Sequence, residues 1–109
     1  MNNDKNYEFS PSARSDFDSL DGSIKTQVLK VVRRVATKPF SQSEGGYGKP
    51  LGNIGGNDLT GLLKIKLKKS GIRIVYRIVQ ENDKMRIIVI AARVDDEVYT
   101  LAAKRMQSE

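Results

Sequence analysis

The sequence predicts an α+β fold, in which a small antiparallel sheet packs on an N-terminal helical hairpin and a C-terminal helix follows. Two observations predict this class. Apolar residues recur at helical spacing near the N-terminus, and three later segments carry the alternating or continuous apolar runs of strands. The 109 residues suit a single domain, residues 1–109, with one core between two layers.

The first 40 residues predict a short strand and two helices. A strand is expected at residues 7–9, Ser10 suits the N-cap of a helix, and Pro11 suits its first position. A second helix should begin with Ser23 as its N-cap and end before Pro39. Its apolar stripe consists of Ile24, Val28, Val31, Val32 and Val35. The two helices should therefore form a hairpin with one apolar side.

The middle of the chain predicts a loop followed by a meander of three strands. Residues 40–57 hold six of the nine glycines, so we expect a long irregular loop, and its spacing does not match a phosphate-binding loop. From Leu62 to Leu67 apolar residues alternate with lysine, which is the pattern of a half-buried strand. The next strands are expected at 72–79 and 86–92, and the second of these is apolar enough to be covered on both faces. A final helix should begin near Asp95.

The residue types that are missing narrow the possible chemistry. The chain contains no cysteine and no histidine, which excludes disulfides, thiol nucleophiles, and the commonest metal ligand and general base. We therefore expect no metal site and no cofactor. The polar start, Met1–Asn6, and the lack of a long apolar run lead us to expect a cytoplasmic protein without a membrane span.

Positive charge is concentrated in the predicted strands. The net charge is +6, and the run from Leu59 to Gln80 contains no acidic residue. Its six basic residues are Lys64, Lys66, Lys68, Lys69, Arg73 and Arg77. Strand parity directs the first three from one face, and Arg73 can join them across the turn. An anionic ligand would compensate this row of like charges; a solvated outer face of the sheet is the alternative interpretation.

Two residues near the C-terminus add to this pattern. Arg93 ends an apolar strand and Tyr99 follows on the predicted helix. Together they would suit a phosphate clamp and a base-stacking ring, whereas separately they would be a surface arginine and a packed tyrosine.

The stretch from Leu63 to Arg77, LKIKLKKSGIRIVYR, closely resembles the centre of the RelE family of bacterial toxins. The segments Lys49–Leu51 and Leu59–Leu62 resemble the family's approach to this strand, and Arg93 with Asp96–Tyr99 resembles its end. The resemblance spans nearly the whole chain and keeps the order of the elements. It implies the RelE-like microbial RNase fold. It also implies an mRNA endonuclease that acts on the ribosome and is held inactive by a cognate antitoxin.

The resemblance also implies roles for residues of matching type. The family's paired strand lysines fall on Lys64 and Lys66, and the arginine after the turn falls on Arg73. The family's proton-donating arginine falls on Arg93, and its C-terminal tyrosine falls on Tyr99. The expected RNA- and ribosome-binding residues are Lys68, Lys69 and Arg77. The sequence departs from the family at Leu63, where an aromatic residue is common, and at Asp95, where a basic residue is common.

The same residues suit cleavage of RNA by its own 2′-hydroxyl group. Clustered cations stabilise the charge that builds up on the phosphorane. Like charges around a lysine favour its neutral form and make it a better general base, and we favour Lys66 over Lys64 for this role. Arginine is a poor proton donor on chemical grounds, so the acid role of Arg93 comes from the resemblance alone.

Two other functions stay open. A ParE-like toxin shares the fold but inhibits DNA gyrase without cutting RNA, and a basic RNA-binding domain would catalyse nothing. The joint presence of both strand lysines, both arginines and the tyrosine favours the RelE-type enzyme. Whether expression stops translation or DNA replication distinguishes the two toxins.

Overall fold

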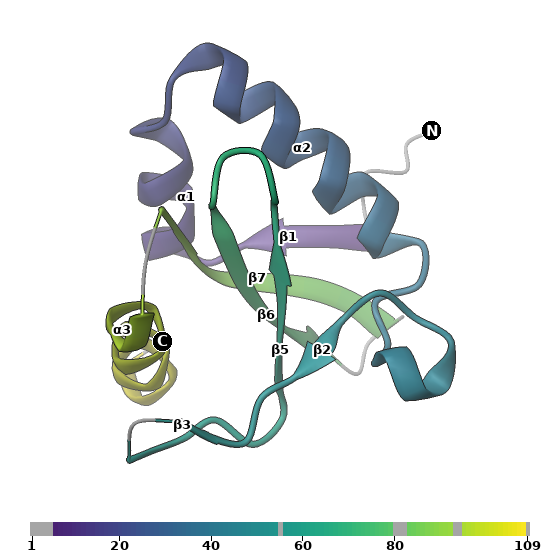
Figure 1. The fold of residues 1–109 in the computed structure, drawn as a ribbon, viewed down its shortest axis with the longest axis vertical. Helices are drawn as coiled ribbons and strands as arrows, with labels where there is room; N and C mark the ends of the chain where they lie inside the picture. The colour runs from purple at the N-terminus through teal and green to yellow at the C-terminus, as the bar shows by residue number, and fades with distance from the viewer. Residues whose placement is uncertain (1–5, 55, 80–82, 93–94, 109) are drawn as a thin grey trace.

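Helices lie on both faces of a central sheet in the computed structural model, which describes residues 6–54, 56–79, 83–92 and 95–108 (Figure 1). The helices are α1 (Pro11–Asp18), α2 (Gly22–Ala36) and α3 (Asp95–Ser108). The strands are β1 (Tyr7–Phe9), β2 (Lys49–Pro50), β3 (Asn53–Ile54), β4 (Asn57–Asp58), β5 (Leu62–Lys66), β6 (Arg73–Val79) and β7 (Lys84–Ala91). The predicted α+β class and order of the main elements are confirmed, and the glycine-rich loop holds the short strands β2 to β4.

The central sheet has the strand order β1-β7-β6-β5-β2. The pairs β5–β6, β6–β7 and β2–β5 are antiparallel, and the first two form the predicted meander. However, β1 runs parallel to β7. The sheet is therefore mixed, whereas the sequence predicts an antiparallel sheet. Most of the chain separates β1 from β7, so no tight turn forces them to run in opposite directions.

The two N-terminal helices begin differently from one another. The predicted cap of α1 is confirmed, because the Ser10 hydroxyl accepts a hydrogen bond from the Ala13 backbone N–H at 3.2 Å. For α2 the prediction of Ser23 is wrong, since the helix starts at Gly22 and Asp21 is the N-cap. Asp21 has an extended backbone, and its carbonyl already accepts from Lys25 N–H at 2.8 Å. Ser23 therefore lies inside the first turn.

Each face of the sheet has its own apolar core. On one face α1 and α2 pack against the sheet, and the buried residues include Val28, Val32, Ile74, Tyr76 and Ile87. On the other face α3 packs against the sheet, and the buried residues include Leu62, Val75, Val89, Val98 and Tyr99. The loop contributes Leu51 and Leu59 to this second core. β7 supplies residues to both cores, which confirms the prediction of a strand covered on both faces.

Side chains of α1 and α3 replace a strand along the far half of β7. β1 pairs with β7 only as far as Ile87, which leaves the backbone of the next residues without a neighbouring strand on that side. The Asp16 carboxylate accepts a hydrogen bond from Ile90 N–H at 3.0 Å, and Arg105 donates to the Ile88 carbonyl at 2.8 Å. Arg105 and Asp16 also form an ion pair at 2.8 Å. This contact ties α3 to both α1 and the sheet.

Candidate functional site

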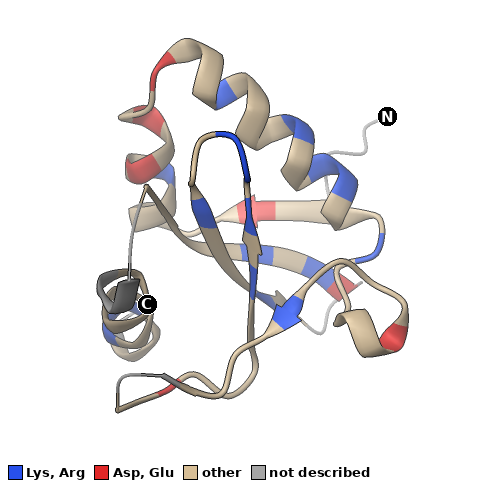
Figure 2. Ribbon diagram, in the orientation of Figure 1, with Lys and Arg blue, Asp and Glu red and all other residues tan. Residues whose placement is uncertain are grey.

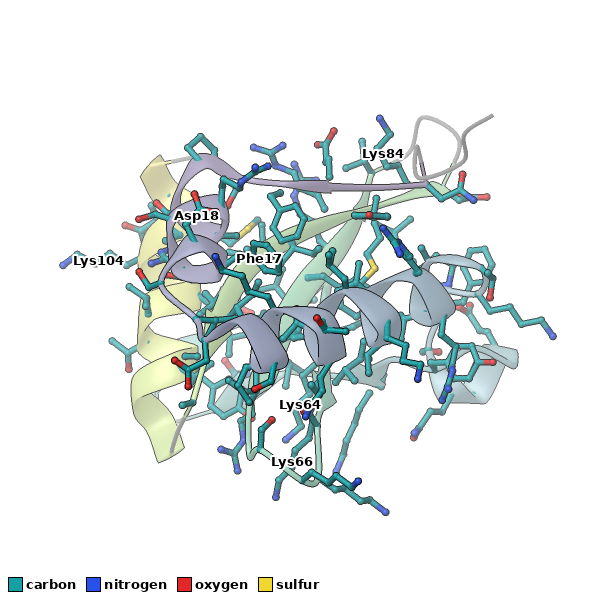
Figure 3. All side chains as sticks on the ribbon, turned by 90° about the horizontal axis from the view of Figure 1, so that it is seen from above. Phe17, Asp18, Lys64, Lys66, Lys84 and Lys104 are labelled. Carbon is teal, nitrogen blue, oxygen red and sulfur yellow. The ribbon has the colours of Figure 1, made fainter. Side chains whose placement is uncertain are left out.

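Three of the predicted cations meet where β5 and β6 lie side by side. Lys66 and Arg73 are direct cross-strand partners, and Lys64 is paired with Val75 in the same ladder. Val75 belongs to the core under α3, whereas Leu63 and Ile65 pack toward α2, so these cations lie on the face opposite the helical hairpin. The prediction that Lys64, Lys66 and Arg73 share one face of the sheet is confirmed. Figure 3 shows Lys64 and Lys66 close to one another and far from Lys84.

Tyr99 brings α3 into contact with this cluster. The Lys64 ammonium donates a hydrogen bond to the Tyr99 hydroxyl at 3.0 Å and lies 5.4 Å from the centre of its ring. The ring belongs to the apolar core and is 6% exposed, which leaves little surface on which a base could stack. Lys64 is half-buried by these contacts, whereas Lys66 is exposed. Lys64 is therefore held in place by Tyr99, whereas the side chain of Lys66 is free to change its position.

The remaining predicted residues lie around or outside this cluster. Lys68 and Lys69 are exposed in the β5–β6 turn. Arg77 is on the same sheet face, but it pairs with Leu62 and Arg86 at the other end of β6. Arg93 lies outside the described residues, and β7 ends at Ala91, directly opposite Arg73.

A second group of cations lies on the same sheet face, around Glu8 of β1. Arg86 donates a hydrogen bond to the Glu8 carboxylate at 2.6 Å, and Lys84 is 3.6 Å from it. The hydrogen bond from Arg86 is the largest effect and holds the pKa of Glu8 below its usual value. Burial is the next largest and raises the pKa, and the charges of Arg86 and Lys84 lower it further. This group is neutralised in part by its own carboxylate. Among the side chains that the structure describes, which do not include those of residues 93–97, no carboxylate is ion-paired with Lys64, Lys66 or Arg73.

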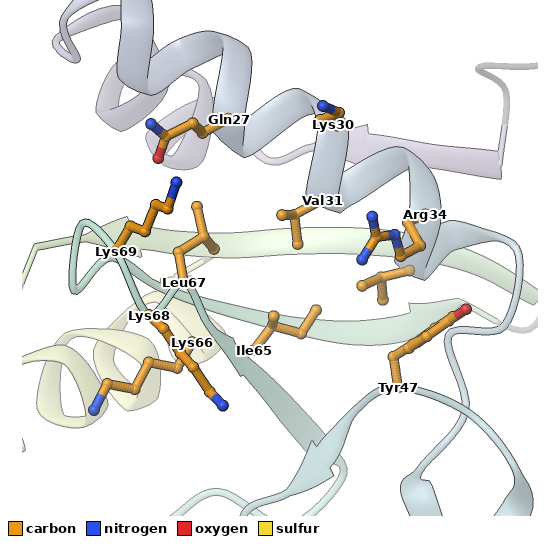
Figure 4. Close-up of a pocket in the computed structure, with 11 residues that line it drawn as sticks. Gln27, Lys30, Val31, Arg34, Tyr47, Ile65, Lys66, Leu67, Lys68 and Lys69 are labelled. Atoms are coloured by element: carbon orange, nitrogen blue, oxygen red, sulfur yellow. The ribbon is translucent and has the colours of Figure 1, made fainter.

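A groove separates α2 from the β5–β6 turn. It has a volume of about 420 Å³, and its floor is formed by apolar side chains from α2 and β5. The basic residues on its rim are Lys30, Arg34, Lys66, Lys68 and Lys69. Figure 4 shows Val31 facing Ile65 and Leu67 across the groove, with Lys66 and Lys68 directed away from α2. Figure 2 shows that basic residues also follow α2 itself. The groove is thus apolar inside and positively charged at its edges.

The sequence pattern did not reveal Lys49 as part of the basic cluster. This exposed residue of β2 is the direct cross-strand partner of Lys64, and it lies on the same face of the sheet. It falls in the glycine-rich segment that the sequence predicts as a loop, so strand parity gave no signal. Only the pairing of β2 with β5 brings it to the cluster.

The cluster has the properties of an anion-binding site. Its exposed and half-buried cations can bind a phosphate and stabilise negative charge that develops on it. Among the described residues, no group of three or more acidic side chains is placed to hold a metal ion. Within the same residues, every helix is too short or too polar to cross a bilayer.

Comparison with models of known protein families shows to which family this chain belongs. The model of a family described as the ParE toxin of type II toxin–antitoxin systems, parDE, matches residues 7–97. The chain belongs to this toxin family. It is similar to a RelE-like toxin protein of Escherichia coli, with 27% identity over 92% of this chain and 95% of the relative. It is also similar to the mRNA interferase toxin RelE of Escherichia coli K12, with 28% identity over 91% of this chain and 94% of the relative.

Solved structures of RelE toxins have the same fold. The isolated Escherichia coli RelE toxin matches with a TM-score of 0.64 and 25% identity, over 92% of this chain and 96% of that one. A RelE variant bound to a peptide of its antitoxin RelBc also matches with a TM-score of 0.64 and 25% identity, over 91% of this chain and 94% of that one. The resemblance of the central sequence stretch predicts a RelE-type toxin of the RelE/ParE superfamily. The matches to the family model, to the relatives and to the solved structures confirm this prediction.

Proposed function

We propose that this chain is the toxin of a type II toxin–antitoxin system and an endoribonuclease that cleaves mRNA on the ribosome and so inhibits translation. The observation that carries the proposal is the cluster of Lys64, Lys66 and Arg73, which no carboxylate among the described side chains neutralises. The similarity to a toxin named mRNA interferase supports the reaction class. Because mRNA and ribosomes are its targets, we place its action in the cytoplasm.

The proposed reaction is attack of a 2′-hydroxyl group on the adjacent phosphate. Lys66 is exposed, so it can approach the hydroxyl and accept its proton as the general base. Lys64 is held by the Tyr99 hydroxyl, and with Arg73 it is placed to stabilise the phosphorane electrostatically. Protonation of the departing 5′-oxygen falls to Arg93, an assignment that rests on the resemblance to the RelE family.

The proposed roles of the outer cations concern binding and not chemistry. Lys68 and Lys69 extend the basic surface beyond Lys66 into the exposed turn, where they can contact RNA phosphates. Arg77 lies opposite Arg86, so we expect it to contact RNA farther from the cleaved bond. Substituting these residues should weaken binding more than it slows the chemical step.

We propose that a cognate antitoxin is the protein partner. A RelE variant with this fold has been solved with an antitoxin peptide bound. The groove between α2 and the β5–β6 turn suits an amphipathic segment of such a partner, because its floor is apolar and its rim carries cations without acids. A partner segment with acidic residues would also cover part of the basic cluster. We therefore expect its association rate to fall as salt rises.

Inhibition of DNA gyrase is the second candidate function, because the matching family model is described by the ParE toxin. The relatives and solved structures named above are RelE toxins, and the clustered cations suit RNA cleavage, so this candidate is less favoured. The two functions predict different targets. One protein stops translation by cutting mRNA, and the other blocks replication.

The experiment that tests the proposal is mapping of mRNA ends after the purified protein is added to translating ribosomes. We expect new cuts in the mRNA with the parent protein and none with Lys66→Ala or Arg93→Ala. A supercoiling assay with purified gyrase runs in parallel and should show no inhibition. Intact mRNA together with inhibited gyrase would overturn the proposal in favour of the ParE-like function.

A further inference from the structure

Lys49 occupies a defined position beside the basic cluster. β2 pairs with the start of β5, and in this register Lys49 lies directly opposite Lys64. Directly opposed side chains of an antiparallel pair project from the same face, with Cβ atoms about 5 Å apart. Lys49 is exposed, and it extends the cluster across a third strand.

The backbone on either side of Lys49 is tightly constrained. Gly48 is buried against Leu63 and the hydroxyl of Tyr76, and a Cβ atom at this position would lie 2.7 Å from a Leu63 methyl carbon. On the other side Leu51 is 8% exposed, and its N–H donates to the Leu62 carbonyl at 2.9 Å. These contacts hold β2 against β5. The position of Lys49 is therefore a property of the packed fold and not of a free loop.

The register creates two like-charged cross-strand pairs in one corner of the sheet. Lys49 faces Lys64, and Lys66 faces Arg73. Like charges directly opposite one another destabilise a strand pair. Among the side chains that the structure describes, none of the four cations is ion-paired with a carboxylate. A ligand with two adjacent negative charges would offset both repulsions, and consecutive phosphates of a nucleic acid strand provide them.

We propose that Lys49 is an RNA-binding residue of this site, which holds the phosphate next to the one that Lys64 and Arg73 contact. The inference rests on the proposed function, because it takes RNA as the substrate. It assigns Lys49 to the binding of a second phosphate and not to the chemical step. The site then recognises at least two consecutive phosphates across β2, β5 and β6.

The test compares Lys49→Ala with Lys49→Arg and with Lys38→Ala. Lys38 is a matched control, because it is also an exposed lysine but lies next to Pro39, whose carbonyl contacts Tyr76 on the opposite face of the sheet. The first measurement is KM and kcat for ribosome-bound mRNA. The second is the affinity of a fluorescent 2′-O-methyl RNA oligonucleotide, which cannot be cleaved because its 2′-oxygens are blocked, measured by anisotropy at several salt concentrations.

We expect Lys49→Ala to raise KM and to weaken oligonucleotide binding about three- to tenfold, with kcat unchanged. The slope of log affinity against log salt should become shallower by roughly 0.7, the loss of one phosphate contact to a single strand. Lys49→Arg should restore both quantities, and Lys38→Ala should match the parent.

Two results separate this inference from the proposed function. If the parent cleaves mRNA but Lys49→Ala has the same KM, affinity and salt slope as Lys38→Ala, the role of Lys49 is wrong and the proposed function stands. If the parent does not cleave mRNA but Lys49→Ala alone weakens oligonucleotide binding, the proposed function is wrong and the phosphate contact stands. A lower kcat with unchanged oligonucleotide binding would also overturn the inference.

Discussion

Two groups of cations lie on the same face of the sheet, and they differ in what neutralises them. At one end Arg86 and Lys84 share the carboxylate of Glu8. At the other end Lys64, Lys66 and Arg73 lie together in a ladder in which Lys66 and Arg73 face each other, and none of them is ion-paired with a described side chain. The first group contributes to the folded structure of the free protein. The second group is arranged for a negative charge that none of the described side chains supplies.

The contrast shows why the number of positive charges does not locate a site. Both groups contain arginine and lysine on strands of the sheet, and each of these cations adds the same charge to the net charge of +6. The difference lies in one residue of β1, which the parallel pairing with β7 places beside Arg86. Cations that are paired with a carboxylate should contribute to the stability of the fold. Cations without such a partner should contribute to binding and catalysis.

The largest effect should come from Lys66→Ala. Loss of a group that acts in the transition state should slow single-turnover cleavage about a hundredfold or more. Melting should stay near the parent temperature, because Lys66 is exposed. Arg86→Ala is the matched control from the neutralised group and should cleave at the parent rate. Equal cleavage by both variants would remove the distinction between the two groups.

A smaller effect is expected when the link between α3 and α1 is removed. In Arg105→Gln the Asp16 carboxylate loses its ion pair, in which the two side chains are only 15% and 19% exposed. We expect a loss of about 1–3 kcal/mol in the free energy of unfolding, measured by urea denaturation. Cleavage should fall less than in Lys66→Ala, since the cations of β5 and β6 remain. Unchanged stability would show that the link does not hold α3.

Tyr99→Phe should have a milder effect on activity than Tyr99→Ala. Phenylalanine keeps the buried ring and removes only the hydroxyl that accepts from Lys64, so we expect cleavage to fall about three- to tenfold with little change in melting. Alanine would leave a cavity in the core under α3 and cost about 3–5 kcal/mol of stability. Equal melting temperatures for the two variants would contradict the buried position of the ring.

The smallest effect should come from Glu8→Gln, and it should depend on pH. The pKa of Glu8 is lowered in the folded state, chiefly by the hydrogen bond from Arg86, so its ionised form stabilises the fold above the ordinary value of 4.5. That contribution is lost as the pH falls through the lower folded value. Because the pair is partly exposed, we expect Glu8→Gln to cost only about 0.5 kcal/mol at neutral pH. A deficit that persists in strong acid, or slower cleavage, would contradict this role.

Much of the fold follows from local patterns in the sequence. The alternation from Leu62 to Leu67 predicts both the strand and the face of its lysines, and the structure confirms both. The pairing of β1 with β7 was not predictable in the same way, because no turn links strands so far apart in the chain. The cap of α2 was also missed, since Asp21 and Ser23 are both favourable N-cap residues and only the backbone decides between them.

The site was predictable to the extent that it lies on regular strands. Parity brings Lys64 and Lys66 to one face, and the short turn brings Arg73 beside them. Lys49 was not predicted as a site residue, because the strand that carries it is only two residues long and lies in a glycine-rich segment. The hydrogen bond between Lys64 and Tyr99 depends on how α3 packs on the sheet, which no local pattern encodes. The role of Arg93 stays a prediction, because that residue lies outside the described part of the chain.

The most direct test of the central claim is the chemistry of the cut ends in ribosome-bound mRNA. Cleavage by a cationic cluster through the 2′-hydroxyl should give a 2′,3′-cyclic phosphate on one fragment and a 5′-hydroxyl on the other. An mRNA with a single 2′-deoxy sugar at the mapped cleavage site should stay intact there. Fragments that end in a 3′-hydroxyl and a 5′-phosphate, or cleavage that persists at the deoxy position, would contradict the claim.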